Sequence, residues 1–249
     1  MDILKKKKYN LQELSQFLQL QKEFNETKAT QQCRVLIIDD KVEDPLYPFK
    51  DQIDVLRKQY GCSITTKVDL DNVQDAQAYD FIICDREGVG KKICGPKGDG
   101  LALLKNLIKE YPGKSYVLYS DKDVNISRLA EFKRYHTVKM WSKNTLLDNE
   151  IYGGDGFVEH VRKSIEYVTN PLTRWKELRL KFLKNTDIDL SDLANLEHAY
   201  IKSIMTQDPK HYDKAIKELQ GYSDSNAIIP YLKASKSIIE FAISVISII

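Results

Sequence analysis

The stretch Arg34-Val35-Leu36-Ile37-Ile38-Asp39-Asp40 places an apolar run directly before two adjacent carboxylates. A continuous apolar run of this length is typical of a strand buried on both faces, as in a parallel sheet. The acids then stand where the strand leaves the sheet, and ligands of open α/β sheets bind at the carboxyl ends of strands. Two carboxylates there repel each other unless a cation or a proton offsets them, and their hard oxygens suit Mg²⁺. The stretch alone fits equally a strand followed by a polar turn with an acidic helix cap.

Strand-like and helix-like segments alternate along the rest of the chain. Apolar or β-branched runs predict strands at residues 34–38, 63–68, 79–85, 115–119 and 137–141. Helical periodicity predicts helices at 49–60, 101–111, 126–135 and 157–168, with a short one at 71–78. Proline-containing, glycine-rich or polar segments predict loops at 41–48, 88–100 and 144–156. Alternation at this spacing predicts an α/β fold with a five-stranded parallel sheet, right-handed crossovers and helices on both faces.

Helical segments flank this region on both sides. Residues 9–29 carry a helical apolar stripe, and Asn170-Pro171 ends the last helix of the sheet region. Beyond it, helices are expected at about 172–185, 189–206, 210–220 and 226–249. We therefore predict three regions: an N-terminal extension (1–31), a sheet domain (32–169) and an all-α output or dimerisation region (170–249). The apolar end, 238–249, is expected to form the core or the self-association face of the third region.

Composition limits the classes of function. The 249 residues are 42% hydrophobic and 30% charged, which is compatible with a packed core, and the formal net charge is +2. This small charge, nearly balanced after residue 171, gives no case for nucleic acid or an anionic membrane as a partner. The apolar tail is too short to span a bilayer, and the start lacks the apolar core of a secretory signal. Four cysteines without a C-x-x-C pair predict reduced thiols and a cytoplasmic protein.

Polar side chains end four of the predicted strands. They are Asp39, Asp40, Asp85, Ser120 and Lys143. Because the carboxyl ends of parallel strands share one edge of the sheet, these groups are expected to gather there. Three carboxylates around one point are strongly unfavourable without a divalent cation, whereas a lysine supplies a fixed positive charge and a serine a hydrogen bond. Such a set suits the transfer of a phosphoryl group to a carboxylate.

With these residues the chain resembles the receiver domain of bacterial two-component response regulators. The resemblance covers about residues 32–168 and includes the spacings from Asp40 to Asp85 and from Ser120 to Lys143. Asp-Gly-Leu-Ala-Leu-Leu-Lys (99–105) resembles the start of the third receiver helix, and Glu-Tyr-Pro (110–112) resembles its end. The resemblance implies a flavodoxin-like, doubly wound fold and a role in signal transduction by phosphorelay.

The resemblance also implies roles for individual residues. Asp85 would be the phosphoacceptor, and Mg²⁺ would be held by Asp39, Asp40, Asp85 and the backbone carbonyl of Glu87. Ser120 would be the switch hydroxyl, and Lys143 would contact the phosphoryl group. The donor would be a histidine kinase or a phosphotransfer protein. Output would follow from a shift between two conformations near the fourth and fifth strands.

Several positions depart from the family's pattern. The loop 88–100 is longer than usual and basic, and Asn144 stands where a proline usually follows the lysine. Asp121 follows Ser120 in place of a small residue and adds a carboxylate near the phosphoryl position. Met140 stands where an aromatic switch residue is usual, with Trp141 beside it. These positions are candidate modulators of phosphorylation and of conformational coupling.

Two other functions stay open at this stage. The first is a receiver-like scaffold that is not phosphorylated and acts by protein contacts alone. The second is a phosphatase of the haloacid-dehalogenase type, which also forms an aspartyl phosphate at a strand end. That class expects Asp-x-Asp, which Asp85-Arg86-Glu87 only approximates, so the pair Asp39-Asp40 fits receivers better. The leading prediction is thus a phosphoacceptor with at most autodephosphorylation, and not a conventional enzyme.

Overall fold

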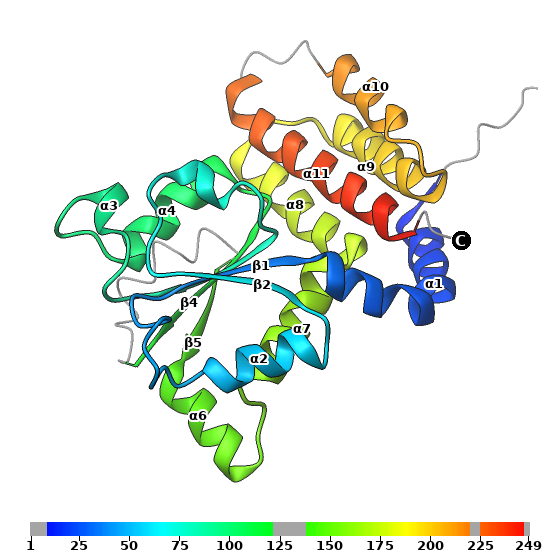
Figure 1. Cartoon of the computed structure of the whole chain (residues 1–249). Coiled ribbons are helices and arrows are strands. Elements are labelled where there is room, and N and C mark those ends of the chain that lie inside the picture. Colours follow the sequence, from blue (N-terminus) through cyan, green and yellow to red (C-terminus); the bar gives the residue numbers. More distant parts are fainter. Residues whose placement is uncertain (1–8, 122–137, 220–224, 247–249) are drawn as a thin grey trace, which may run out of the picture. The chain divides into compact units, whose positions relative to one another are not determined.

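A five-stranded, all-parallel sheet lies within residues 34–142 in a computed structural model, which describes residues 9–121, 138–219 and 225–246 (Figure 1). The strands are β1 (Arg34–Ile38), β2 (Ser63–Lys67), β3 (Phe81–Asp85), β4 (Ser115–Ser120) and β5 (Val138–Ser142). Their order is β2-β1-β3-β4-β5. This is the flavodoxin-like, doubly wound order, in which the chain reverses direction of winding at β1 and β3. The predicted fold class is confirmed.

Helices cover both faces of this sheet. On one face, α4 (Gly100–Glu110) and the short helix η1 (Val73–Ala76) pack on alternate strand residues such as Leu36 and Ile82. On the other face lie α2 (Lys50–Lys58) and α7 (Phe157–Thr169), and the ring of Phe49 stacks on that of Phe157 at 4.5 Å. Both faces of β1 are therefore buried, which explains its continuous apolar sequence.

Two of the predicted loops contain helices. The prediction of a loop at 144–156 is wrong, because α6 spans Lys143–Tyr152. The Ser142 side chain caps its first turn by accepting a hydrogen bond from the Thr145 amide, and Gly153 ends it in a left-handed conformation at φ 88°. The segment 88–100 likewise contains the single-turn helix α3 (Lys91–Cys94). The helix predicted at 126–135 lies outside the described residues.

The chain divides into two compact units, residues 27–169 and residues 1–26 with 170–249. The helix α1 (Leu11–Gln32) contributes to both. The second unit also holds α8 (Pro171–Asn185), α9 (Leu190–Met205), α10 (Lys210–Glu218) and α11 (Ser225–Ile246), in accord with the predicted all-α region. Its core includes a stacked pair, Trp175 and Tyr200, with ring centroids 4.6 Å apart. The predicted boundaries at 31 and 169 stay a prediction.

Two observations on the described residues concern membrane spans and cysteines. None of the helices in the described ranges combines the length and the apolar character needed to cross a membrane. All four cysteines, Cys33, Cys62, Cys84 and Cys94, lie in the described ranges and are free thiols there.

We expect Ile37→Ala to destabilise the sheet unit strongly. Ile37 is fully buried in β1, so truncation leaves a cavity and lowers the free energy of unfolding by about 2–5 kcal/mol. The matched control is Ile151→Ala at the end of α6, where the side chain is 72% exposed and the change should stay within about 0.5 kcal/mol. Hydrogen exchange of β1 and β3 amides measures both values for this unit. Equal effects of the two variants would contradict the burial of β1.

Candidate functional site

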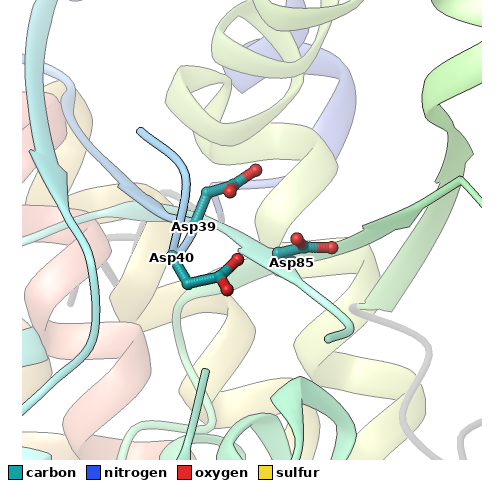
Figure 2. Close-up of side chains that lie close together, drawn as sticks. All are labelled: Asp39, Asp40 and Asp85. Carbon is teal, nitrogen blue, oxygen red and sulfur yellow. The ribbon is translucent and has the colours of Figure 1, made fainter. Parts of the chain in front are cut away.

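Three carboxylates meet where β1 and β3 end (Figure 2). Asp39 and Asp40 follow β1 directly, Asp85 is the last residue of β3, and the two strands pair in parallel. One carboxylate oxygen from each residue lies within 4.8 Å of the others. Asp39 and Asp85 are buried, whereas Asp40 is exposed. The strand register thus brings together acids that lie far apart in the sequence.

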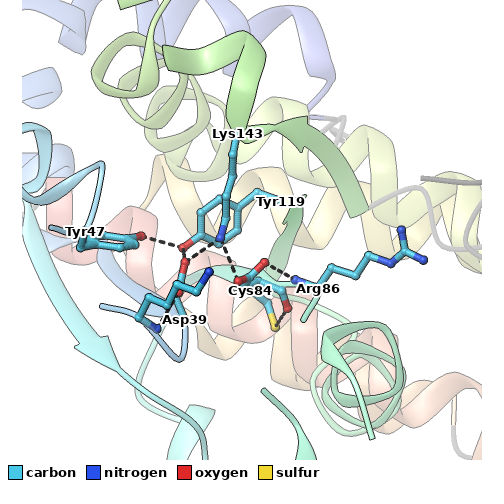
Figure 3. Close-up of polar contacts among 8 residues, drawn as sticks. Asp39, Tyr47, Cys84, Arg86, Tyr119 and Lys143 are labelled. Carbon is cyan, nitrogen blue, oxygen red and sulfur yellow. Dashed lines mark hydrogen bonds and ion pairs between the residues drawn. The ribbon is translucent and has the colours of Figure 1, made fainter. Parts of the chain in front are cut away.

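Lys143 connects the two buried acids. Its Nζ donates to Asp39 Oδ2 at 2.9 Å (Figure 3). It also donates to Asp85 Oδ2 at 2.8 Å. Burial opposes the charged form of this lysine, but the hydrogen bond to Asp85 and the charge of Asp39 outweigh it and raise the pKa of Lys143. Burial raises the pKa of Asp85 as well, against the opposing effect of Lys143. The result is a buried ion-paired triad.

Two tyrosines belong to the same cluster. Tyr119 OH donates to Asp39 Oδ2 at 2.5 Å, and the hydroxyls of Tyr47 and Tyr119 are 2.7 Å apart. The Lys143 Nζ also lies 4.5 Å from the centre of the Tyr119 ring, within the range of a cation–π contact. Burial raises the pKa of both phenols, so they stay protonated and act as donors. Neither tyrosine was among the candidates from the sequence.

The backbone that follows Asp85 packs closely against this residue, at both its carboxyl group and its main-chain carbonyl. Arg86 N–H donates to Asp85 Oδ1 at 2.7 Å. Gly100 packs so closely that a Cβ atom there would lie 1.7 Å from the Asp85 carbonyl oxygen. Further along, Gly90 N–H donates to Asp69 Oδ1 at 2.8 Å, which ties the basic segment 88–100 to the end of β2. The amide of Gly90 is therefore bonded to the segment after β2, whereas the sequence indicated a long flexible loop.

The other candidates lie at the same edge of the sheet or next to it. Ser120 is buried at the end of β4, opposite Ser142 of β5. Asp121 is exposed, and its carbonyl accepts a hydrogen bond from Asn144 Nδ2 at 3.0 Å.

The β5 candidates have different surroundings. Met140 packs with the α4 side of the core, whereas Trp141 makes edge contacts with Phe81 and Phe157 on the other side. Glu87 follows Arg86 directly after β3. The structure thus joins Asp39, Asp40, Asp85 and Lys143 in one cluster, while Trp141 is part of the packed core.

The donor set suits a hard divalent cation. Three carboxylates and one ammonium group leave two negative charges in excess, which a single divalent ion balances. Among the described residues the Asp40 carboxylate has no hydrogen-bond or ion-pair partner, so its oxygens are available as ligands. Carboxylate oxygens together with an exposed entry at Asp40 are compatible with Mg²⁺, which usually keeps several waters.

Comparisons with known proteins do not assign this chain to a family. The chain matches no protein-family model, and no curated protein is similar to it. Among solved structures it is similar to NtrX from Brucella abortus, determined in complex with ATP, with 19% identity and a TM-score of 0.39. The match covers 70% of this chain and 35% of that one. A likeness this low carries no argument about function, so the assignment of this chain to the flavodoxin-like architecture rests on its own strand order.

Proposed function

We propose that this chain is a two-component-type signalling protein whose sheet unit accepts a phosphoryl group on Asp85. The observation that carries the proposal is the buried lysine between Asp39 and Asp85 at the reversal point of the sheet. That point is where ligands of this architecture bind. The resemblance of the sequence to receiver domains supports the same role.

The proposed reaction transfers a phosphoryl group between two proteins. An oxygen of Asp85 attacks phosphorus, the P–N bond of a phosphohistidine breaks, and the nitrogen keeps the electron pair and takes up a proton. The product is an acyl phosphate, which water hydrolyses to inorganic phosphate and the free carboxylate. Because the protein offers a carboxylate nucleophile and positive charge, positioning and charge neutralisation account for most of the catalysis.

Mg²⁺ is the proposed cofactor, and it supplies positive charge for the transferred oxygens when bound. Asp39, Asp40, Asp85 and the Glu87 carbonyl would hold it. Lys143 is proposed to neutralise a further oxygen, and the contact of its Nζ with the Asp85 carboxylate supports this role. The Ser120 hydroxyl is proposed to donate to the phosphoryl group, with Asp121 and Met140 as modulators.

The proposed partners follow from this chemistry. A histidine kinase or a phosphotransfer protein would supply the phosphoryl group in the cytoplasm. The helical unit, built around Trp175 and Tyr200, would bind a protein partner or a second copy of the chain. A change at Lys143 would reach α6 directly, because this lysine is the first residue of that helix.

The acceptor is tested with acetyl phosphate and MgCl₂, followed by intact-mass measurement. We expect one added phosphoryl group on the wild type and none on Asp85→Asn, since the amide is not a nucleophile of this kind. The matched control is Asp80→Asn, because Asp80 lies just before β3 and hydrogen-bonds the Arg34 amide away from the cluster. That variant should be phosphorylated as the wild type is.

The other outcomes separate the remaining functions. An adduct that persists in Asp85→Asn would show that another residue is the acceptor. A folded wild type without an adduct would favour a scaffold that acts by contacts alone. Rapid turnover of many phosphate esters would instead favour a phosphatase of the haloacid-dehalogenase type.

We expect Gly88→Ala to weaken Mg²⁺ binding. Gly88 has φ 81°, and a Cβ atom there would lie 2.1 Å from the Asp40 carboxyl carbon, so the carboxylate must move. Gly95→Ala is a matched control, because Gly95 has φ 84° and open space around a Cβ atom. Both variants carry similar backbone strain, but only the first displaces a proposed ligand. Calorimetric titration with MgCl₂ should show a loss of affinity of about tenfold or more for Gly88→Ala alone. Equal affinities would argue against Asp40 as a ligand.

A further inference from the structure

A chain of buried hydroxyl groups leads away from the carboxylate cluster. It runs from Tyr47, in the loop after Asp40, through Tyr119 of β4 to Asp39 (Figure 3). Tyr119 is fully buried and Tyr47 is 4% exposed. Buried phenol hydroxyls usually have a hydrogen-bond partner. Here the two hydroxyls lead to Asp39, a proposed metal ligand, and not to a backbone carbonyl.

The direction of the hydrogen bonds follows from the number of protons. Tyr119 has a single hydroxyl proton, and an ionised carboxylate only accepts, so that proton points to Asp39. Tyr47 must then be the donor to the Tyr119 oxygen. The bond from Tyr47 therefore fixes the rotation of the Tyr119 hydroxyl, and through it the orientation of Asp39.

Asp39 is held by three donors at once. Its Oδ2 accepts from Lys143 Nζ and from Tyr119 OH, and its Oδ1 accepts from the Lys41 amide at 2.9 Å. A carboxylate has about four acceptor positions, so about one remains for a cation or for its bound water. The hydrogen bond from the Tyr119 hydroxyl thus helps to set the direction of the remaining acceptor position of Asp39.

Tyr119 also contacts the second functional group. Its ring lies under the Lys143 ammonium, whereas its hydroxyl binds Asp39. One side chain therefore touches both the proposed metal ligand and the proposed phosphoryl-binding lysine. Partners of metal-ligating carboxylates in general orient them and tune affinity.

We infer that Tyr119 is a positioning residue for Asp39 and Lys143, and that Tyr47 acts through it. The inference rests on the proposed function, because it concerns Mg²⁺ binding and phosphoryl transfer at the same site. It adds that the Mg²⁺ affinity of this chain depends on a phenol that is not itself a ligand. The same hydrogen bonds connect the loop that contains Tyr47 with the site.

The test is a double-mutant cycle with Tyr119→Phe, Tyr47→Phe and the double variant. Each change removes one hydroxyl and keeps the ring. We expect Tyr119→Phe to lower Mg²⁺ affinity by about 10–100-fold and to slow adduct formation with acetyl phosphate. Tyr47→Phe should have a smaller effect of the same kind. The double variant should be no worse than Tyr119→Phe, since Tyr47 acts only through Tyr119.

The matched control is Tyr116→Phe on the same strand. Tyr116 is equally buried, but its hydroxyl donates to the carbonyls of Leu107 and Tyr111 on the α4 face. It should lose stability much as Tyr119→Phe does, with Mg²⁺ affinity unchanged. A purely structural role of Tyr119 would give the two variants the same Mg²⁺ affinity, and that result would overturn the inference.

Three further outcomes bear on this inference and on the proposed function. If the wild type binds Mg²⁺ but forms no adduct, the acceptor role fails while the affinities still decide the role of Tyr119. If the effects of Tyr47→Phe and Tyr119→Phe on affinity simply add, Tyr47 does not act through Tyr119. If the wild type binds no Mg²⁺, both proposals are rejected.

Discussion

The ion pairs from Lys143 to Asp39 and Asp85 are the interaction on which the site depends. All three groups are buried, and charges removed from water are costly unless they are closely paired. The sheet order makes the pairing possible, because β1 and β3 are neighbours and both end on an acid. The lysine arrives from the start of α6, where the Ser142 cap fixes the first turn. The lysine offsets one of the three carboxylate charges, and a divalent cation balances the two that remain.

The hydroxyl chain gives this cluster a second layer of support. Tyr119 contacts both Asp39 and Lys143. Tyr47, in the loop after Asp40, is hydrogen-bonded to Tyr119 and so connects this loop with the cluster. The glycines play a different part, because Gly88 and Gly100 let backbone approach Asp40 and Asp85 where a side chain would collide. The hydroxyl chain thus acts on Asp39, whereas close backbone approach acts on the Asp40 carboxylate and on the main chain of Asp85.

The sequence predicted what depends on local pattern. Buried parallel strands are continuously apolar, so β1 and β3 and their terminal acids were recognisable from residues alone. The helix α6 was missed because, apart from Lys143, it buries only Leu146, so it lacks an apolar stripe and relies on its caps. Tyr119 was missed because it resembles any apolar strand residue, and its partners Asp39 and Tyr47 lie far away in sequence. Its position beside Asp85 in the sheet marks it as a site residue, but this position follows only from the strand register.

The most direct test of the account measures the free energy of unfolding of the sheet unit against MgCl₂ concentration, for the wild type and Lys143→Met. Without Mg²⁺, removing the lysine leaves two buried carboxylates unpaired and should cost about 3–5 kcal/mol. A ligand that binds only the folded state stabilises it, and the site without its lysine is more negative. We expect Mg²⁺ to stabilise both proteins and to narrow the difference between their free energies of unfolding. Stabilisation of neither protein at any Mg²⁺ concentration would contradict a cation site at Asp39, Asp40 and Asp85.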